Sequence, residues 1–433
     1  MLTISKKPDI KKMLQQLWQH FCNDSLFRNS IYLMLSTAVQ AFFGFIFWLL
    51  VARLYTPAEV GFGSTLISAV VFISYISLLG LNNTLIKFLP TSKQRSEKIN
   101  SSLVLVFSAA FFVSLVYILI LPHIAPRLSF VAENIYFSSA FILLSSFCAI
   151  NLLTDSVFIA YRASKYNFLI YTIQSIAKLI LPLVLVTFGS FGVFASSGLA
   201  ATIALILSIF YLTKKFNYKP KISVSKNLLK DLWKFSSANY LSDFFNITPI
   251  IIIPIIIMNK LGAPQAGYYY LAFMLANLLY AVAYSVSQSL FAEGSHGEKS
   301  LRSLFKHSAL ILAAIMIPAG LILSLLGPFL LHIFGKSYGE EAGKVITILA
   351  LAAPAVAAYI LSIILLRITN KLNTLIGVNA IYVLTICGLA YVWASRGLVW
   401  VALAWLIGHL ITASISFLLI FFSSRKKILP TNF

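Results

Sequence analysis

Long apolar runs recur along the chain and are separated by short polar segments. Each run is about 20 residues long, which is the length of a helix that crosses a bilayer. Strands of a membrane barrel would be about half as long and would alternate apolar and polar positions. A backbone in lipid must satisfy its own hydrogen bonds, so the pattern predicts an all-α, polytopic membrane protein. The expected spans are 29–53, 59–82, 100–121, 134–161, 166–188, 191–213, 236–258, 266–291, 304–326, 344–366, 373–394 and 397–422.

One short apolar run does not fit this series. Pro328–Phe334 is too brief to cross the membrane. We expect it to lie at the interface, within an outside loop covering about 327–343. The span that follows, 344–366, is expected to be one helix.

The positions of Lys and Arg predict the orientation of the chain. If the N-terminus is cytoplasmic, the inside segments hold 26 of the 33 Lys and Arg, the outside segments hold six, and Lys178 lies within a span. Cytoplasmic loops are enriched in Lys and Arg, so both termini are expected in the cytoplasm. This placement also accounts for the net charge of +21 without a nucleic-acid partner.

Composition limits what else the chain can be. Hydrophobic residues make up 60% of it and charged residues 10%, which leaves no material for a large soluble domain. Cys22, Cys148 and Cys387 are far apart and have no metal-ligand spacing. We therefore expect a transporter rather than an enzyme, in the cell membrane, with no metal and no cofactor.

An internal repeat divides the spans into six and six. Arg53-Leu54-Tyr55-Thr56-Pro57 ends the first span, and Lys260-Leu261-Gly262-Ala263-Pro264 ends the seventh, 207 residues later; Gly61 and Gly267 follow them, 206 residues apart. Six is even, so the halves enter from the same side as parallel repeats, which often hold a substrate site between them. The expected parts are 1–28, a cytoplasmic, interfacial amphipathic segment; 29–213, the N-lobe; 214–234, a basic cytoplasmic linker; 235–422, the C-lobe; and 423–433, a cytoplasmic tail.

Polar residues follow one face of several spans, at spacings of three and four. Such a face turns toward protein or water, because lipid contact needs no polar groups. The stripes favour a wet cavity between the lobes, and hydrogen bonding between helices is the alternative. The stripe residues that we take as binding candidates are Ser36 and Gln40 on the first span, Asn167, Tyr171, Gln174 and Lys178 on the fifth, Asn239 and Asn246 on the seventh, and Asn277, Tyr280 and Tyr284 on the eighth.

Charges within the spans suggest more specific roles. Lys178 lies about 18 Å from the cytoplasmic end of its span, where an unpaired Lys costs about 3 kcal/mol on insertion scales. It would contact an anionic group such as a phosphate, or form a buried ion pair with Asp155 or Asp243. Those two acids are candidates for carrying a coupling ion, H⁺ or Na⁺, although each could equally lie in water near the headgroups.

Arg53 and Lys260 occupy matching positions at the outer ends of spans one and seven. They would guide a phosphate group as it leaves. The alternative is that both side chains extend to the outer headgroups.

Two stretches of sequence resemble a known family. Asn29–Pro90 contains VARLYTPAEVGFGSTLISAVVFISYISLLGLNNTLIKFLP, and Gly327–Pro354 reads GPFLLHIFGKSYGEEAGKVITILALAAP. They resemble Wzx-type polysaccharide and O-antigen flippases, in the superfamily that also holds MATE multidrug exporters and the lipid II flippase. The resemblance extends over nearly the whole chain and rests on diffuse packing patterns.

The resemblance implies a V-shaped, MATE-like, two-lobed transporter with alternating access. Its substrate would be an oligosaccharide on polyprenyl pyrophosphate, moved to the outer leaflet of a bacterial inner membrane. Its partners would be membrane lipids and other polysaccharide-assembly proteins. Flippases of this kind resemble one another in having a cationic lumen, and Lys178 fits that pattern.

Three other functions remain open at the level of sequence. A cation-coupled drug antiporter would use acids in its lumen, but the first span has none between Asn29 and Arg53. A membrane glycosyltransferase or polymerase would need a larger loop outside the membrane. A scaffold without transport activity could use the lysine-rich linker for contacts.

Overall fold

The computed structural model describes residues 25–224, 237–296, 301–369 and 371–425. In these ranges the chain forms helices joined by short turns and contains no strand. Each of the twelve expected spans overlaps a helix or a pair of consecutive helices, so the all-α prediction is confirmed. The expected segments 1–28, 214–234 and 423–433 lie partly outside the described residues.

The first half of the chain forms one group of helices. A capping box starts the second helix, because Thr56 and Glu59 hydrogen-bond each other's backbone N–H while Pro57 takes the first helical position. That helix stops where Leu79 and Gly80 adopt positive φ angles of 50° and 73°, which divides the second expected span in two. The elements are α2 (Ser25–Leu54), α3 (Pro57–Ser77), α4 (Leu81–Phe88), α5 (Arg95–Ile124), η1 (Pro126–Leu128), α6 (Ser129–Glu133), α7 (Ile135–Ala160), α8 (Ser164–Val184), η2 (Val186–Phe188) and α9 (Gly189–Phe216).

The second half forms a matching group. Its elements are α11 (Ser237–Lys260), α12 (Ala263–His296), α13 (Leu301–Phe334), α14 (Lys336–Leu351), α15 (Ala353–Ile368), α16 (Leu372–Trp393), η3 (Ala394–Arg396) and α17 (Leu398–Arg425). The expected loop at 327–343 is wrong, because these residues are almost all helical, whereas the interfacial position of Pro328–Phe334 stays a prediction. Pro328 continues inside α13, and α14 begins directly after Gly335. Prolines are tolerated within helices in a membrane, so the presence of Pro328 did not mean that the helix ends there.

The expected tenth span is also not one straight helix. α14 and α15 meet at Ala352 with a bend of 43°. Pro354 lies in the first turn of α15, where its missing N–H would have no partner in any case. The proline therefore fits the start of a new helix better than the middle of a long one.

Length and apolar composition make most of these helices suitable for crossing a bilayer. In the described part of the chain ten helices meet both conditions, and the bent α14–α15 pair makes an eleventh. The described apolar part of α11, Phe244–Lys260, is shorter. Large apolar side chains are exposed along α5 and α13, for example Phe112, Leu325 and Phe329, as expected of surfaces that face lipid.

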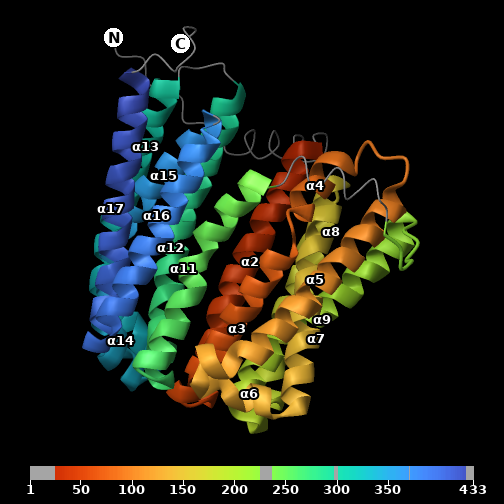
Figure 1. Ribbon diagram of the computed structural model, residues 1–433, viewed down its shortest axis with the longest axis horizontal. Helices are drawn as coiled ribbons and strands as arrows, with labels where there is room; N and C mark the ends of the chain where they lie inside the picture. The colour runs from red at the N-terminus through yellow and green to blue at the C-terminus, as the bar shows by residue number, and fades with distance from the viewer. Residues whose placement is uncertain (1–24, 225–236, 297–300, 370, 426–433) are drawn as a thin grey trace, which may run out of the picture.

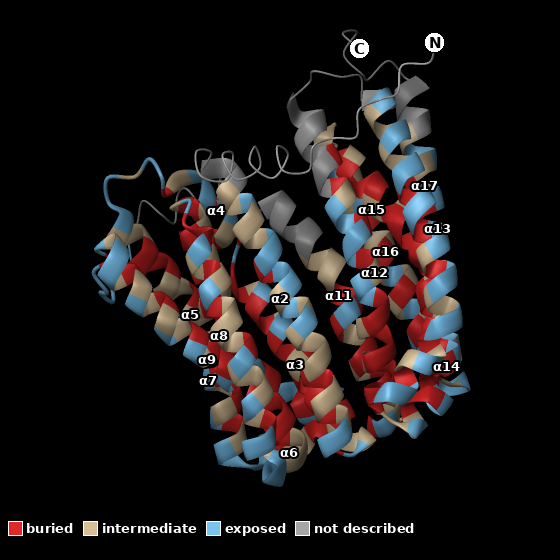
Figure 2. Ribbon diagram, turned by 180° about the vertical axis from the view of Figure 1, so that it is seen from behind, coloured by how far each residue is buried: buried red, intermediate tan, exposed pale blue. Residues whose placement is uncertain are grey.

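The two groups, α2–α9 and α11–α17, are the two lobes of the molecule. They touch through α3 with α11 and α12, and through α2 with α13. Figures 1 and 2 show the lobes meeting at the end where α2 finishes and diverging toward the end where α2 begins. We call these the closed end and the open end.

Candidate functional site

A polar pocket of about 360 Å³ lies within the N-lobe. It brings together five residues that the sequence singled out on three separate helices: Ser36, Gln40, Asp155, Asn167 and Tyr171. The other residues that line it are Leu33, Thr37, Tyr75, Leu78, Asn82, Ile86, Leu152, Ser156 and Ile159. We call this the N-lobe pocket.

The spacing of polar residues on α8 explains how the pocket forms. Asn167, Tyr171, Gln174 and Lys178 recur every three or four residues, so they share one face of the helix. α8 packs against α2 and also contacts α7, and residues of all three helices line the pocket. The polar face of α8 is thus turned into the lobe rather than toward lipid.

Asp155 on α7 is tied to α8 by two contacts. Its carboxylate accepts a hydrogen bond from the Tyr171 hydroxyl, and its backbone carbonyl accepts one from Asn167 Nδ2 at 3.3 Å. Asn167 is 1% exposed, yet its Oδ1 atom has no hydrogen-bond partner within the described structure. A buried amide oxygen without a donor is costly, so Asn167 is a polar group that the described lobe leaves unsatisfied.

The polar face of α8 continues beyond the pocket to Lys178. This residue lies seven positions past Tyr171, about 10 Å further along the helix axis. Its ammonium stands over the ring of Phe47 on α2, 4.5 Å from the centroid. The described side chains place no carboxylate within ion-pair distance of Lys178, and Asp155 hydrogen-bonds Tyr171 instead.

Two residues between the pocket and Lys178 have acceptors that lack donors. Asn151 Oδ1 on α7 and Gln174 Oε1 on α8 are buried without a hydrogen-bond partner in the described structure. The sequence analysis identified Gln174 but missed Asn151, and it also missed Tyr75 and Asn82 in the pocket lining. The spacing of four between Asn151 and Asp155 on α7 was an available signal for the former.

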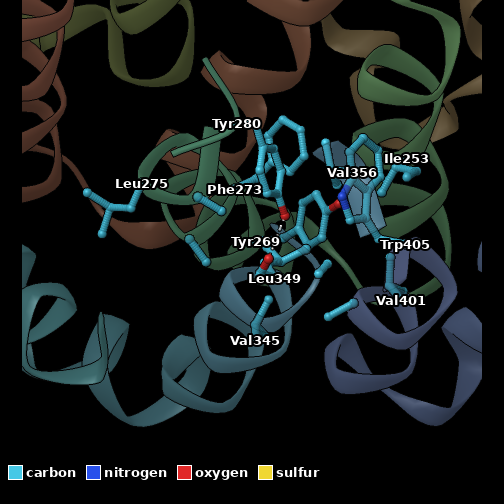
Figure 3. Close-up of a cluster of buried hydrophobic side chains, with 14 of the residues drawn as sticks. Ile253, Tyr269, Phe273, Leu275, Tyr280, Val345, Leu349, Val356, Val401 and Trp405 are labelled. Atoms are coloured by element: carbon cyan, nitrogen blue, oxygen red, sulfur yellow. Dashed lines mark hydrogen bonds between the residues drawn. The ribbon is translucent and has the colours of Figure 1, made fainter. Parts of the chain in front are cut away.

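The polar residues predicted in the C-lobe do not form a matching pocket. Tyr280 is buried and donates a hydrogen bond to the carbonyl oxygen of Leu349 on α14, at 2.6 Å. Figure 3 shows it among Phe273, Trp405 and other apolar side chains. The Tyr359 hydroxyl lies 2.7 Å from Asn379 Oδ1 and 3.3 Å from Asn246 Oδ1, which bridges α15 to α16 and α11.

The remaining C-lobe candidates are spread over different surroundings. Asn277 and Tyr284 are exposed on α12. The side chains of Asn239 and Asp243 lie outside the described residues. In the described C-lobe Tyr280 and Tyr359 thus join helices to one another, whereas the hydroxyls of Tyr269 and Tyr338 are buried without a hydrogen-bond partner.

Arg53 and Lys260 lie at the closed end, far along α2 and α11 from the N-lobe pocket. Arg53 donates from Nε and Nη2 to the carbonyl oxygen of Ile333, at 3.1 and 2.5 Å. Lys260 stands over the ring of Tyr391, 3.9 Å from the centroid. The described residues contain no group of His, Cys, Asp and Glu that could hold a metal ion.

Comparison with known proteins extends this description. The profile of a family described as "Polysaccharide biosynthesis protein" matches residues 26–291. A comparison with curated protein sequences found no match.

Several solved structures share the fold. An inward-facing multidrug resistance MATE family transporter of the MOP superfamily is similar with a TM-score of 0.72 at 14% identity, covering 93% of this chain and 100% of its own. An outward-facing structure of such a transporter gives 0.62 at 14% identity, covering 93% and 96%. A MOP superfamily transporter from Pyrococcus furiosus, described as having a binding pocket of reverse polarity, gives 0.63 at 15% identity, covering 93% and 96%.

Proposed function

This chain belongs to the polysaccharide biosynthesis protein family and has the fold of MOP superfamily transporters. From that premise we propose that it is a flippase, which moves an oligosaccharide linked to polyprenyl pyrophosphate across the cytoplasmic membrane by alternating access. The observation that carries the proposal is the single polar face of α8, which runs from the N-lobe pocket to Lys178.

The pocket end of this face fits a glycan. Carboxylate, amide and phenol groups from Gln40, Asp155, Asn167 and Tyr171 supply donors and acceptors at several angles. Sugar hydroxyls both donate and accept, so they can bond the amide, carboxylate and phenol groups of the lining. The carboxylate also makes this end unsuitable for a phosphate.

The Lys178 end of the face fits the diphosphate. An ammonium held over an aromatic ring, with no carboxylate close to it in the described structure, keeps its charge available for an anion. Its distance of about 10 Å from Tyr171 separates the anionic group from the sugar-binding groups. A substrate that is anionic at one point and hydroxylated along the rest matches both ends.

Charge and shape support the orientation in the membrane that the proposed direction of transport requires. The Lys and Arg count of the loops favours cytoplasmic termini, so the open end would face the cytoplasm. The greater similarity to the inward-facing relative, 0.72 against 0.62, supports this orientation. The substrate would enter from the cytoplasmic leaflet and leave at the outer one. In this proposal Asp155 and Asp243 are candidates for a coupling H⁺ or Na⁺, and other polysaccharide-assembly proteins would be partners in a bacterial inner membrane.

A cation-coupled drug antiporter is the second candidate. It is favoured by the multidrug MATE transporters among the structural relatives and by the carboxylate of Asp155 in the pocket. Against it stands Lys178 on the same polar face, since a cationic drug would be repelled by an ammonium with no neutralising acid nearby in the described residues.

The proposal is tested by complementation in cells that lack their own O-antigen or capsule flippase. We expect the wild-type chain to restore surface polysaccharide and Lys178→Ala to fail at equal membrane abundance. Lys336→Ala is the matched control, because it removes one positive charge from an exposed residue whose ion pair with Glu340 contributes little. The antiporter would be favoured if none of these chains restored surface polysaccharide with several lipid-linked substrates and the wild-type chain gave resistance to cationic drugs.

A further inference from the structure

Two side chains, Arg53 and Asn259, make hydrogen bonds that cross between the lobes at the closed end. Arg53, near the end of α2, donates to the carbonyl oxygen of Ile333 in the last turn of α13. Asn259, near the end of α11, donates from Nδ2 to the carbonyl oxygen of Ile124, the last residue of α5, at 2.6 Å. Each bond supplies a donor to a helix C-terminus, where carbonyl groups lack partners within their own helix.

These two contacts are related by the internal repeat. The 207-residue offset that matches Pro57 to Pro264 also matches Arg53 to Lys260, the neighbour of Asn259. Ile124 is the last residue of α5 and Ile333 the last but one of α13, the helices that contain the corresponding third and ninth expected spans. Each lobe therefore uses the end of its first helix to cap the third helix of the other lobe.

The repeat-matched glycines also lie where the two lobes meet. A Cβ atom on Gly61 would overlap the carbonyl oxygen of Ala263, and one on Gly267 would lie 2.6 Å from the carbonyl oxygen of Pro57 and 3.0 Å from the Gly61 nitrogen. α3 and α12 thus touch backbone to backbone at these two glycines. Ring contacts also cross between the lobes, from Trp48 to Tyr270 and from Phe45 to Phe334.

Arg127 adds a further contact between the two lobes. Its Nη1 atom would lie 2.5 Å from a Cβ atom on Gly262, which has a φ of +106°. This places a guanidinium of the N-lobe directly on the turn that joins α11 to α12. Only a residue without a side chain fits both the backbone angle and the space.

We propose that these contacts form a pseudo-symmetric latch, in which Arg53, Asn259 and the Gly61–Gly267 contact hold the closed end shut and release it when the lobes rock. These hydrogen bonds are at exposed positions, so water can replace them when they break. The latch is therefore reversible. The inference assumes rocking of the lobes but no particular cargo, so it can hold even if the proposed substrate is wrong.

Accessibility of the N-lobe pocket tests the latch. In a chain whose Cys22, Cys148 and Cys387 are replaced by serine, Thr37→Cys places a reporter in the pocket, where Thr37 is exposed. Its reaction with a membrane-impermeant maleimide is measured in intact cells and in inside-out vesicles, without any substrate. The reporter chain with an intact latch should react from the side of the open end and scarcely from the other.

Gly61→Ala should then raise labelling from the closed side by tenfold or more, because the added methyl group cannot coexist with the Ala263 carbonyl. Gly44→Ala is the matched control on α2, since a Cβ there meets nothing within 4 Å, and it should change nothing. Arg53→Gln combined with Asn259→Ala should raise labelling by about tenfold, as expected for the loss of a hydrogen bond from a charged donor and a second, neutral one. Arg396→Gln is their control, because Arg396 contacts Trp400 within its own lobe.

Labelling from the open side reports that each variant is inserted and folded. If Gly61→Ala does not insert, the Arg53 and Asn259 pair decides the question alone. Unchanged labelling from the closed side in the inserted latch variants would overturn the proposal. If the variants show the expected labelling but the wild-type chain fails in complementation, the latch proposal stands and the proposed flippase function is contradicted.

Discussion

The two lobes repeat one backbone plan but use their polar residues differently. In the N-lobe the polar face of α8 opens onto a pocket, and acceptors such as Asn167 Oδ1 stay unpaired in the described structure. In the C-lobe Tyr280 and Tyr359 bond to neighbouring helices among stacked aromatic rings. The comparison teaches that similar helix arrangements can carry a polar face that opens onto a pocket in one lobe and hydrogen bonds between helices in the other.

The largest expected effect comes from moving the charge between lobes. Lys178→Leu should reduce transport by about 10- to 100-fold, because a charge-assisted contact to the substrate is lost. The repeat places Leu384 at the counterpart position, and Leu384 is 73% exposed. Adding Leu384→Lys should not restore transport, because the pocket belongs to the N-lobe alone. Surface polysaccharide at equal membrane abundance is the readout, and restoration by the double variant would break the distinction between the lobes.

Removing one hydroxyl from each lobe sharpens the comparison. Tyr171→Phe takes a donor from the Asp155 carboxylate in the pocket, so transport should fall about tenfold and the free energy of unfolding by about 1–3 kcal/mol. Tyr280→Phe removes the bond to Leu349, so it should destabilise the protein by about 1 kcal/mol and leave transport nearly unchanged. Transport assays and thermal unfolding of the purified protein in detergent measure the two effects.

The same pair of variants can contradict the account. Equal losses of transport would mean that the buried tyrosine of the C-lobe acts on the substrate as directly as the one in the pocket. A loss of stability in Tyr171→Phe without any loss of transport would mean that the Asp155 contact only joins α7 to α8.

A smaller effect is expected at the exposed amide of α12. Asn277→Ala should leave stability within about 0.5 kcal/mol of wild type, as for other exposed sites. Transport should fall about twofold if α12 contacts the glycan only briefly during transport. A tenfold loss, measured in the same assay, would place a second binding surface on the C-lobe.

The sequence predicted the helices and the polar face of α8, because both depend on local periodicity. It missed that Pro328 lies within α13, since proline has opposite meanings inside a membrane helix and at its end. The polar residues of α12 do not share one environment, because Tyr280 bonds to α14 while Asn277 and Tyr284 are exposed. This could not be predicted, since part of α14 was expected to be a loop. The partner of Arg53 on α13 could not be predicted either, because 280 residues separate it from Ile333 along the chain.

Translocation in reconstituted vesicles tests the central claim most directly. A lipid-linked oligosaccharide is placed in the vesicle membrane, and its appearance in the opposite leaflet is followed with a glycan-specific lectin or hydrolase. Wild-type protein should move the substrate, Lys336→Ala should match it, and Lys178→Ala should be at least tenfold slower. Equal rates for wild type and Lys178→Ala would contradict the claim that the polar face of α8 binds the substrate.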